Sequence, residues 1–149
     1  SVDAATLKKK RVVLTTKLDR IVSFDRTTGV LDAEPGVTIG DLACLFAGAR
    51  GGEAGGGWFP GVVPGTRFVT LGGAVAADIH GKNHHRDGSF SSCVDSITLR
   101  LPSGESLECS RTERRGLFGA TVGGMGLTGM IERVRMRMRP VSSSWIRTR

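Results

Sequence analysis

The sequence predicts an α+β fold, a mainly antiparallel sheet flanked by short helices. Short runs rich in β-branched residues recur between turns of Gly, Pro and Asp, as is typical of strands joined by tight turns. Within residues 127–140, Val134, Met136 and Met138 alternate with arginines, which is the period-two pattern of a half-buried strand. Residues 71–77 consist only of Gly, Ala, Val and Leu, which suits a short helix with a nearly bare surface. The 149 residues suffice for one domain, or part of one, with a buried core.

The N-terminal half predicts an antiparallel meander that leads into a short helix. A turn is expected at 25–29, and Pro35-Gly36 ends the strand that follows it. A helix is expected at 40–46, because Asp41 favours its start and its apolar residues lie on one face. Residues 49–61 contain six glycines and predict an exposed loop. The meander consists of residues 11–16, 20–24, 30–34 and 37–39.

The C-terminal half predicts a hairpin, a helix and one long strand. Residues 94–101 and 105–109 form the hairpin across a Pro-Ser-Gly turn. Thr112 is expected to cap a helix that the glycine-rich residues 122–126 interrupt. In the strand at 127–140, the arginines occupy the wet face, where they also protect a sheet edge from aggregation. A polar loop at 86–92 precedes the hairpin.

The net charge of +7 is concentrated at the two ends of the chain. Residues 1–11 contribute +3 and residues 133–149 contribute +6, whereas the body between them carries −2. The sequence has no tyrosine and only 5% aromatic residues, so no base-stacking platform and no nucleic-acid partner are expected. The basic ends favour a solvated face, with an anionic membrane surface as the alternative partner.

Three cysteines, Cys44, Cys93 and Cys109, show neither a zinc pattern nor a disulfide framework. Their odd number indicates a reducing compartment or buried thiols. No apolar run approaches the roughly 20 residues of a membrane span, and the first residues lack the order of a signal peptide. We expect a cytoplasmic protein or one bound peripherally at the inner face of the plasma membrane, with a periplasmic location left open.

Residues 64–85 are the candidate site, because they combine a Pro-Gly turn, a glycine pair that opens a helix, and all three histidines. Free N–H groups at the start of such a helix, with its dipole behind them, favour a phosphate. The plainer alternative is that the pair Gly72-Gly73 lets the helix pack closely on a sheet. Each of these signals is weak alone.

Two other chemistries fit the histidines less well. His80, His84 and His85 with Asp78 suggest a metal site, but their spacing matches no zinc pattern, so no metal is expected. A hydrolase triad assembled from Ser89 or Ser91, a histidine and Asp78 lacks a nucleophile-elbow sequence.

Three segments together resemble a known family: EPGVTIGDL at 34–42, VPGTRFVTLGGAVAADIHGKNHH at 63–85, and ATVGGMGLTGMI at 120–131, followed by the alternating strand. They are similar to the FAD-binding (PCMH-type) domain of the vanillyl-alcohol-oxidase superfamily of flavoproteins. Within it, IHGKNHH followed by GSF is most similar to the decaprenylphosphoryl-ribose 2-oxidase subfamily, which serves cell-wall arabinan biosynthesis. The resemblance runs from about residue 12 to about residue 139.

The resemblance implies an FAD site that takes in most of residues 64–85. It places the TLGG segment along the diphosphate and flavin, the segment before His80 along the isoalloxazine ring, and the Ile131 backbone at the adenine end. His80 is the implied catalytic residue near the reactive face, supported by Lys82 and Asn83. The implied cofactor-binding residues are Gly65, Thr66, Thr70, Leu71, Gly72, Gly73, Ala77, Asp78, Ile79, His80, Gly81, Asn83 and Ile131.

The resemblance also implies oxidation of a secondary sugar alcohol to a ketone, with hydride passing to the flavin. The expected substrate is a polyprenyl-phosphate sugar, namely the 2′-hydroxyl of decaprenylphosphoryl-ribose, or another polyol. An NAD-dependent reductase is the expected partner that completes an epimerisation. The alternatives are an alditol or aldonolactone oxidase of the same superfamily, and a non-catalytic remnant whose basic ends bind an anionic polymer or membrane.

The expected organisation is a basic segment at 1–11, a partial FAD-binding domain at 12–140, and a basic tail at 141–149. The family carries a Gly-Arg-Ser-rich diphosphate loop upstream and a substrate domain downstream, and neither is recognised in this sequence. Residues 51–57 form a longer, more glycine-rich loop than the family pattern. We therefore expect the 149-residue chain to be inactive by itself.

Overall fold

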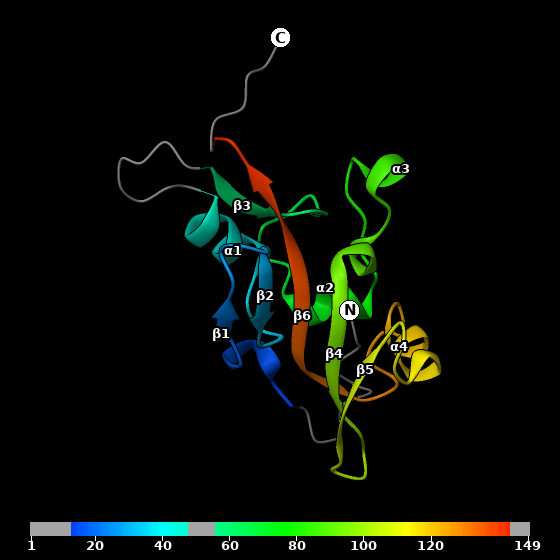
Figure 1. Ribbon diagram of the computed structural model, residues 1–149. Coiled ribbons are helices and arrows are strands. Elements are labelled where there is room, and N and C mark those ends of the chain that lie inside the picture. Colours follow the sequence, from blue (N-terminus) through cyan, green and yellow to red (C-terminus); the bar gives the residue numbers. More distant parts are fainter. Residues whose placement is uncertain (1–12, 48–55, 144–149) are drawn as a thin grey trace.

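The computed structural model of the protein describes residues 13–47 and 56–143. Within these ranges, six strands form one sheet, and every α-helix except the one at His84–Asp87 buries side chains in the core, which confirms the predicted α+β fold (Figure 1). The strands are β1 (Ile21–Phe24), β2 (Val30–Ala33), β3 (Gly57–Pro60), β4 (Val94–Arg100), β5 (Ser106–Ser110) and β6 (Met130–Val141). The helices are α1 (Ile39–Phe46), α2 (Leu71–Ala76), α3 (His84–Asp87) and α4 (Arg115–Thr121), with 3-10 turns at Thr15–Lys17 and Phe90–Cys93.

Strand β6 is the centre of the sheet. One edge of β6 pairs with β2 and then, further along, with β3, while the other edge pairs with β4. All these pairings are antiparallel, and the main path runs β1-β2-β6-β4-β5. The predicted strand is thus confirmed, but its expected place at a sheet edge is wrong. Alternation shows that one face of a strand is wet and does not show how many strands flank it.

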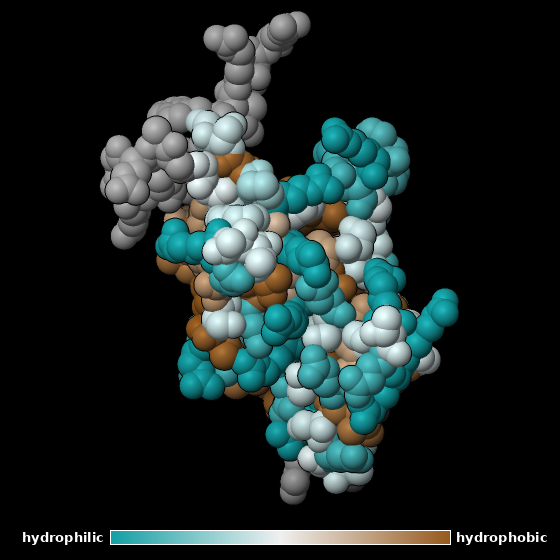
Figure 2. All heavy atoms as spheres, in the orientation of Figure 1, coloured by the Kyte–Doolittle hydropathy of each residue, from teal (hydrophilic) through white to brown (hydrophobic). Residues whose placement is uncertain are grey.

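The two faces of the sheet differ as the alternation on β6 predicts. Val134, Met136 and Met138 are buried beneath the helices, whereas Arg133 and Arg137 pair with Asp32 and Asp95 on the open face. Figure 2 shows this open face as largely hydrophilic. The helix-covered face instead holds a single hydrophobic cluster.

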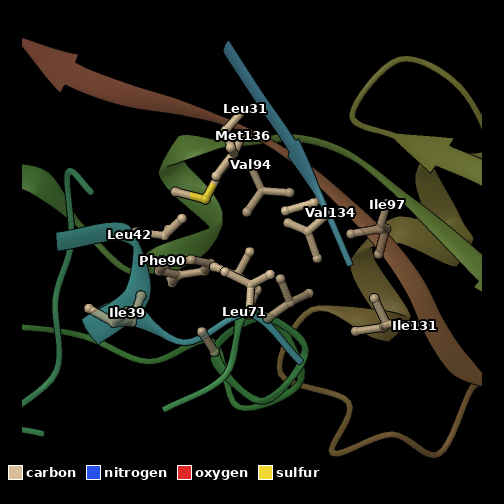
Figure 3. Packing of buried hydrophobic residues seen from close by; sticks show 14 of the residues in the cluster. Leu31, Ile39, Leu42, Leu71, Phe90, Val94, Ile97, Ile131, Val134 and Met136 are labelled. Atoms are coloured by element: carbon tan, nitrogen blue, oxygen red, sulfur yellow. The ribbon is translucent and has the colours of Figure 1, made fainter. Parts of the chain in front are cut away.

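Side chains from the sheet and from the helical layer meet in the core (Figure 3). Leu71 of α2, Leu42 of α1 and Phe90 are fully buried against strand residues such as Leu31 and Met136. Each such side chain contributes about 1.5–3 kcal/mol through burial. The buried face of α2 therefore fixes this helix on the sheet, and its opposite face remains available.

The N-terminal half departs from the predicted meander. Residues 13–16 form no strand, and Val13 and Leu14 are exposed because no strand pairs with them; residues 11–12 lie outside the described ranges. Only the β1–β2 hairpin remains. Helix α1 is confirmed but starts earlier, because Thr38 and Asp41 form a reciprocal capping box that fixes its first turn.

The C-terminal half matches its prediction in the β4–β5 hairpin and in β6. The predicted loop at 49–61 instead contains β3, which pairs with the end of β6, while 48–55 lie outside the described ranges. The predicted polar loop at 86–92 contains the end of α3 and a 3-10 turn. Helix α4 begins after Arg114, which has a φ of 47°, so Thr112 is not its cap. No described helix is long and apolar enough to cross a membrane.

Candidate cofactor-binding site

Thr70 caps the start of helix α2, because its hydroxyl accepts a hydrogen bond from the N–H of Gly73 at 3.2 Å. The N–H of Leu71 donates to the Val37 carbonyl and that of Gly72 to the Pro35 carbonyl, both at 2.8 Å. The N–H groups of the first turn of α2 therefore already have hydrogen-bond acceptors within the protein. The expectation of free N–H groups for a phosphate at this helix start is wrong, because the chain after β2 supplies the acceptors.

The glycines of the predicted site differ in what requires them. A Cβ on Gly72 would lie 2.8 Å from the Pro35 Cβ, and one on Gly81 would lie 2.5 Å from the Val63 carbonyl oxygen. These two glycines are needed for internal packing. Gly65, in contrast, is exposed, and a Cβ there would meet nothing within 4 Å. Its lack of a side chain therefore leaves the backbone open to close approach by a ligand.

The chain leaves α2 through a strained residue. Asp78 has a φ of 41°, and its carboxylate accepts hydrogen bonds from the Ser89 hydroxyl at 2.7 Å and the Ser91 N–H at 2.9 Å. A bridge between His80 and Ser89 then closes the base of a protruding segment. We call residues 80–89 the arm. Asp78 thus anchors the arm at its base.

The arm carries all three histidines of the chain. The rings of His80 and His84 lie edge to face with centroids 5.5 Å apart, and those of His84 and His85 lie 6.0 Å apart. The described residues contain no group of three or more His, Cys, Asp or Glu side chains that could hold a metal ion. The Ser89–Asp78 hydrogen bond has no histidine side chain joined to it among the described contacts.

An open groove of about 740 Å³ lies between the arm and the paired ends of β3 and β6. Figure 2 shows the arm as a hydrophilic lobe with a hollow beside it. Cationic and imidazole groups line this arm groove together with apolar residues and glycines, and its lining includes no carboxylate. The groove therefore suits an anionic or polar ligand with a flat or apolar part. Its lining residues are Phe59, Pro60, Gly61, Val63, Pro64, Gly65, His80, Gly81, Lys82, Asn83, His84, Arg139, Pro140 and Val141.

A second, smaller groove of about 390 Å³ lies over the start of α2. Two segments meet there, because the N–H of Gly123 donates to the Val75 carbonyl and that of Met125 to the Ala76 carbonyl. We call it the glycine groove, because glycines and apolar residues form most of its lining. Its lining residues are Val13, Thr15, Pro35, Gly72, Gly73, Ala76, Met125, Gly126, Gly129, Met130 and Ile131.

The two grooves bring together seven of the predicted site residues. The arm groove contains Gly65, His80, Gly81 and Asn83, and the glycine groove contains Gly72, Gly73 and Ile131. Leu71 is fully buried, so it supports α2 from inside and reaches neither groove. The remaining predicted residues lie beside the grooves and line neither of them: Thr66, Thr70, Ala77, Asp78 and Ile79.

Two features of the arm groove were missed at the sequence level. Its far wall is β3, which was predicted as loop, and Arg139 lines it from β6. The Arg139 guanidinium bonds Asp87 of the arm at 2.5 Å. The arginine repeat signalled that a strand was present but not which arginine would line a groove.

The sheet, the small-residue helix α2 and the two grooves are typical of a cofactor-binding domain. Comparison with known protein families identifies the cofactor. Residues 1–110 match the family described as the FAD binding domain, and the chain belongs to this family. It is part of a family of FAD-linked oxidoreductases, with FAD as the cofactor. The resemblance recognised in the sequence is therefore confirmed.

Among its relatives, the chain is 43% identical over 131 residues to decaprenylphosphoryl-beta-D-ribose oxidase of Mycolicibacterium smegmatis, covering 86% of the chain and 26% of that protein. It is 28% identical to D-lactate dehydrogenase of Anaerostipes hadrus, covering 88% of the chain and 27% of that protein. The crystal structure of carbohydrate oxidase from Microdochium nivale superposes with a TM-score of 0.66 at 25% identity, over 85% of the chain and 25% of that structure. The chain spans about a quarter of the length of these relatives.

Proposed function

We propose that this protein is an FAD-dependent oxidoreductase that oxidises a secondary alcohol of a sugar to a ketone. The proposed substrate is a decaprenylphosphoryl-ribose, as the name of the 43% identical relative suggests. The group proposed to be oxidised is its 2′-hydroxyl. The observation that carries the proposal is the arm groove, where the open backbone at Gly65 and the exposed imidazole of His80 line one cavity. Such a site combines a place for a flat ring with a titratable group beside it.

The glycines of the two grooves determine where FAD can lie close to the backbone. Gly65 accepts close approach of a ring, and the exposed Gly73 offers a surface without a side chain for the rest of the cofactor, beside the groove-lining Ile131. FAD, when bound, supplies the acceptor for the hydride that leaves the alcohol carbon. Because the first turn of α2 uses its N–H groups internally, hydrogen bonds to the diphosphate have to come from elsewhere in the protein. Leu71 is left out of the proposed site.

His80 is the proposed catalytic residue. Its imidazole is exposed in the arm groove and is suited to take the proton of the substrate hydroxyl as the carbon is oxidised. Lys82 adds a positive charge to the same lining, where it favours an anionic part of the substrate. Asn83 supports the arm, because its amide donates to the Gly61 carbonyl at 3.1 Å.

The test compares His80→Ala with His85→Ala, since His85 lies on the same arm but lines neither groove. In protein that carries FAD, we expect His80→Ala to lower kcat for the sugar by about 10²-fold or more. His85→Ala is expected to retain wild-type turnover. A protein that neither retains nor takes up FAD refutes the proposal, and so do equal effects of the two substitutions.

Cofactor placement has its own test. Gly65→Val is expected to weaken FAD binding strongly, whereas Gly119→Val, at another glycine with open space around it, leaves binding unchanged. The isolated 149-residue chain is expected to bind FAD weakly, because α2 offers no spare donors to the diphosphate. Tight one-to-one binding by that chain in a fluorescence titration contradicts this placement.

The remaining proposals concern the surroundings of the domain. We place the FAD-binding domain at residues 12–140 between basic ends, with an NAD-dependent reductase as partner and a location in the cytoplasm or at the inner membrane face. The alternative of a non-catalytic remnant that binds an anionic polymer is weakened by β6, where Arg133, Arg137 and Arg139 already pair with carboxylates. A salt series with anionic vesicles tests that alternative.

A further inference from the structure

The arm is held in place without hydrophobic burial. Its ten residues, 80–89, read HGKNHHRDGS and include no apolar side chain. Figure 1 shows α3 at the end of this segment, away from the sheet. The arm nevertheless forms one side of the groove that contains His80. Polar contacts must therefore set the width of the groove and the position of the imidazole.

Asp87 is the centre of those contacts. One carboxylate oxygen accepts from the Arg139 guanidinium at 2.5 Å, and the other accepts from the Asn83 amide at 2.6 Å. The side chain of Asp87 is only 10% exposed. The Arg139 guanidinium, helped by the Asn83 amide, holds the pKa of Asp87 below its ordinary value. The carboxylate therefore stays charged at neutral pH.

Arg139 reaches the arm from the opposite side of the groove. It lies on β6, where its backbone is paired with Phe59 of β3. Among the ion-paired arginines of β6, Arg133 and Arg137 bond to Asp32 and Asp95, which belong to neighbouring strands. Arg139 instead bonds to a residue outside the sheet. This ion pair thus connects the rigid wall of the groove to the wall that lacks a core.

We propose that the Asp87–Arg139 ion pair positions the arm, and with it His80, over the groove, so that both residues are positioning residues for the reaction. The proposal rests on the proposed function only for its effect on turnover. Neither side chain has to touch the substrate. Loss of the pair leaves the sheet and the core intact, because no core residue contributes to it.

The first experiment is independent of turnover. The chain has three histidines, so imidazole signals in NMR spectra of the 149-residue chain can each be assigned. Asp87→Asn and Arg139→Gln are each expected to shift the imidazole signals of His80 and His84. The shifts are expected to be the same in the two variants. The control is Asp95→Asn, which breaks the comparable Asp95–Arg137 pair on the open face and is expected to leave the histidine signals unchanged.

The second experiment uses the protein with FAD bound. Asp87→Asn and Arg139→Gln are expected to lower kcat by about 10-fold to 100-fold with little change in KM, as displacement of a catalytic group does. The double variant is expected to match the single variants, and Arg139→Lys to recover part of the activity. An intact histidine spectrum in both variants overturns the proposal, as does an effect no larger than that of Asp95→Asn. If the protein has no sugar-oxidising activity but the spectra change as expected, the proposed function fails and the positioning role stands.

Discussion

The glycine groove lies along α2 and the arm groove lies beside β3 and β6, and the two grooves are held together by different parts of the chain. The glycine groove is fixed by backbone hydrogen bonds, such as those from Gly72 to Pro35 and from Met125 to Ala76. The arm groove is fixed by side chains, namely Asn83, Asp87 and Arg139. A backbone-built wall tolerates many side-chain changes but few changes at glycine. A side-chain-built wall is in addition sensitive to changes in the side chains that form its contacts.

This contrast teaches how one domain can combine two kinds of wall. A wall held by backbone hydrogen bonds keeps one shape whatever its side chains are. A wall without a core can change its side chains at little cost to folding. The difference predicts separate effects of substitutions in the two grooves.

The largest effect is expected from Gly72→Val. A Cβ at this position lies 2.8 Å from the Pro35 ring carbon, which cannot move aside, so we expect a loss of about 2–3 kcal/mol in the free energy of unfolding. Gly65→Val is the matched control, since its Cβ meets nothing, and its unfolding midpoint in urea should equal that of the wild type. Equal destabilisation by the two substitutions would remove the distinction between the walls.

A smaller effect is expected from Thr70→Ala at the start of α2. The substitution removes the hydroxyl that accepts from the Gly73 N–H, which costs about 1 kcal/mol as for other helix caps. Thr70→Ser keeps the acceptor and should retain most of the stability in the same urea experiment. The histidine NMR signals of the arm should not respond to either change, and a response would show that the grooves are coupled.

Acidification should release the arm and leave the glycine groove unchanged. The pKa of Asp87 is lowered in the folded protein, so its contribution is present above the ordinary carboxyl range and is lost as pH falls through the lowered value. The arm should therefore stay attached from neutral pH down through the mildly acidic range, and should detach only below pH ~4. NMR signals of arm residues against pH measure this, and detachment already near pH 6 contradicts it.

The smallest effect concerns the thiols. Burial raises the pKa of Cys93 to about 11 and also raises that of Cys109, whereas Cys44 is exposed on α1. At pH 8 we expect one fast-reacting thiol per chain with an aromatic disulfide reagent. Because the charge of Arg139 lowers the pKa of Cys93, Arg139→Gln should raise it slightly further. A fast reaction of Cys93 in the wild type would contradict the burial of its thiol.

The sequence revealed the backbone-built parts better than the side-chain-built ones. The β4–β5 hairpin, β6 and the helix over 71–76 follow from periodicity and turn residues, which are local properties. The ion pair between Asp87 and Arg139 joins residues 52 positions apart, and no local pattern marks it. The same reason explains why β3 was missed: its four residues become a strand only because the end of β6 lies beside them.

The glycines show a second limit of sequence reasoning. Gly65 and Gly72 belong to one motif and look equivalent in the sequence. In the structure, Gly72 is required by Pro35, which lies far away in the chain, and Gly65 is required by nothing inside the protein. Likewise, the N–H groups at the start of α2 are not free as expected, because the carbonyls of Pro35 and Val37 accept their hydrogen bonds. Such facts depend on which segments become neighbours in the fold.

The satisfied N–H groups of α2 also affect the heat of binding. A ligand that covers Gly72, Gly73 and Ala76 releases water from an apolar surface and breaks few hydrogen bonds between these amides and water. Calorimetry should then show a negative heat-capacity change dominated by apolar burial. Affinity at this end of the helix would depend on shape more than on charge, so it should vary little with ionic strength.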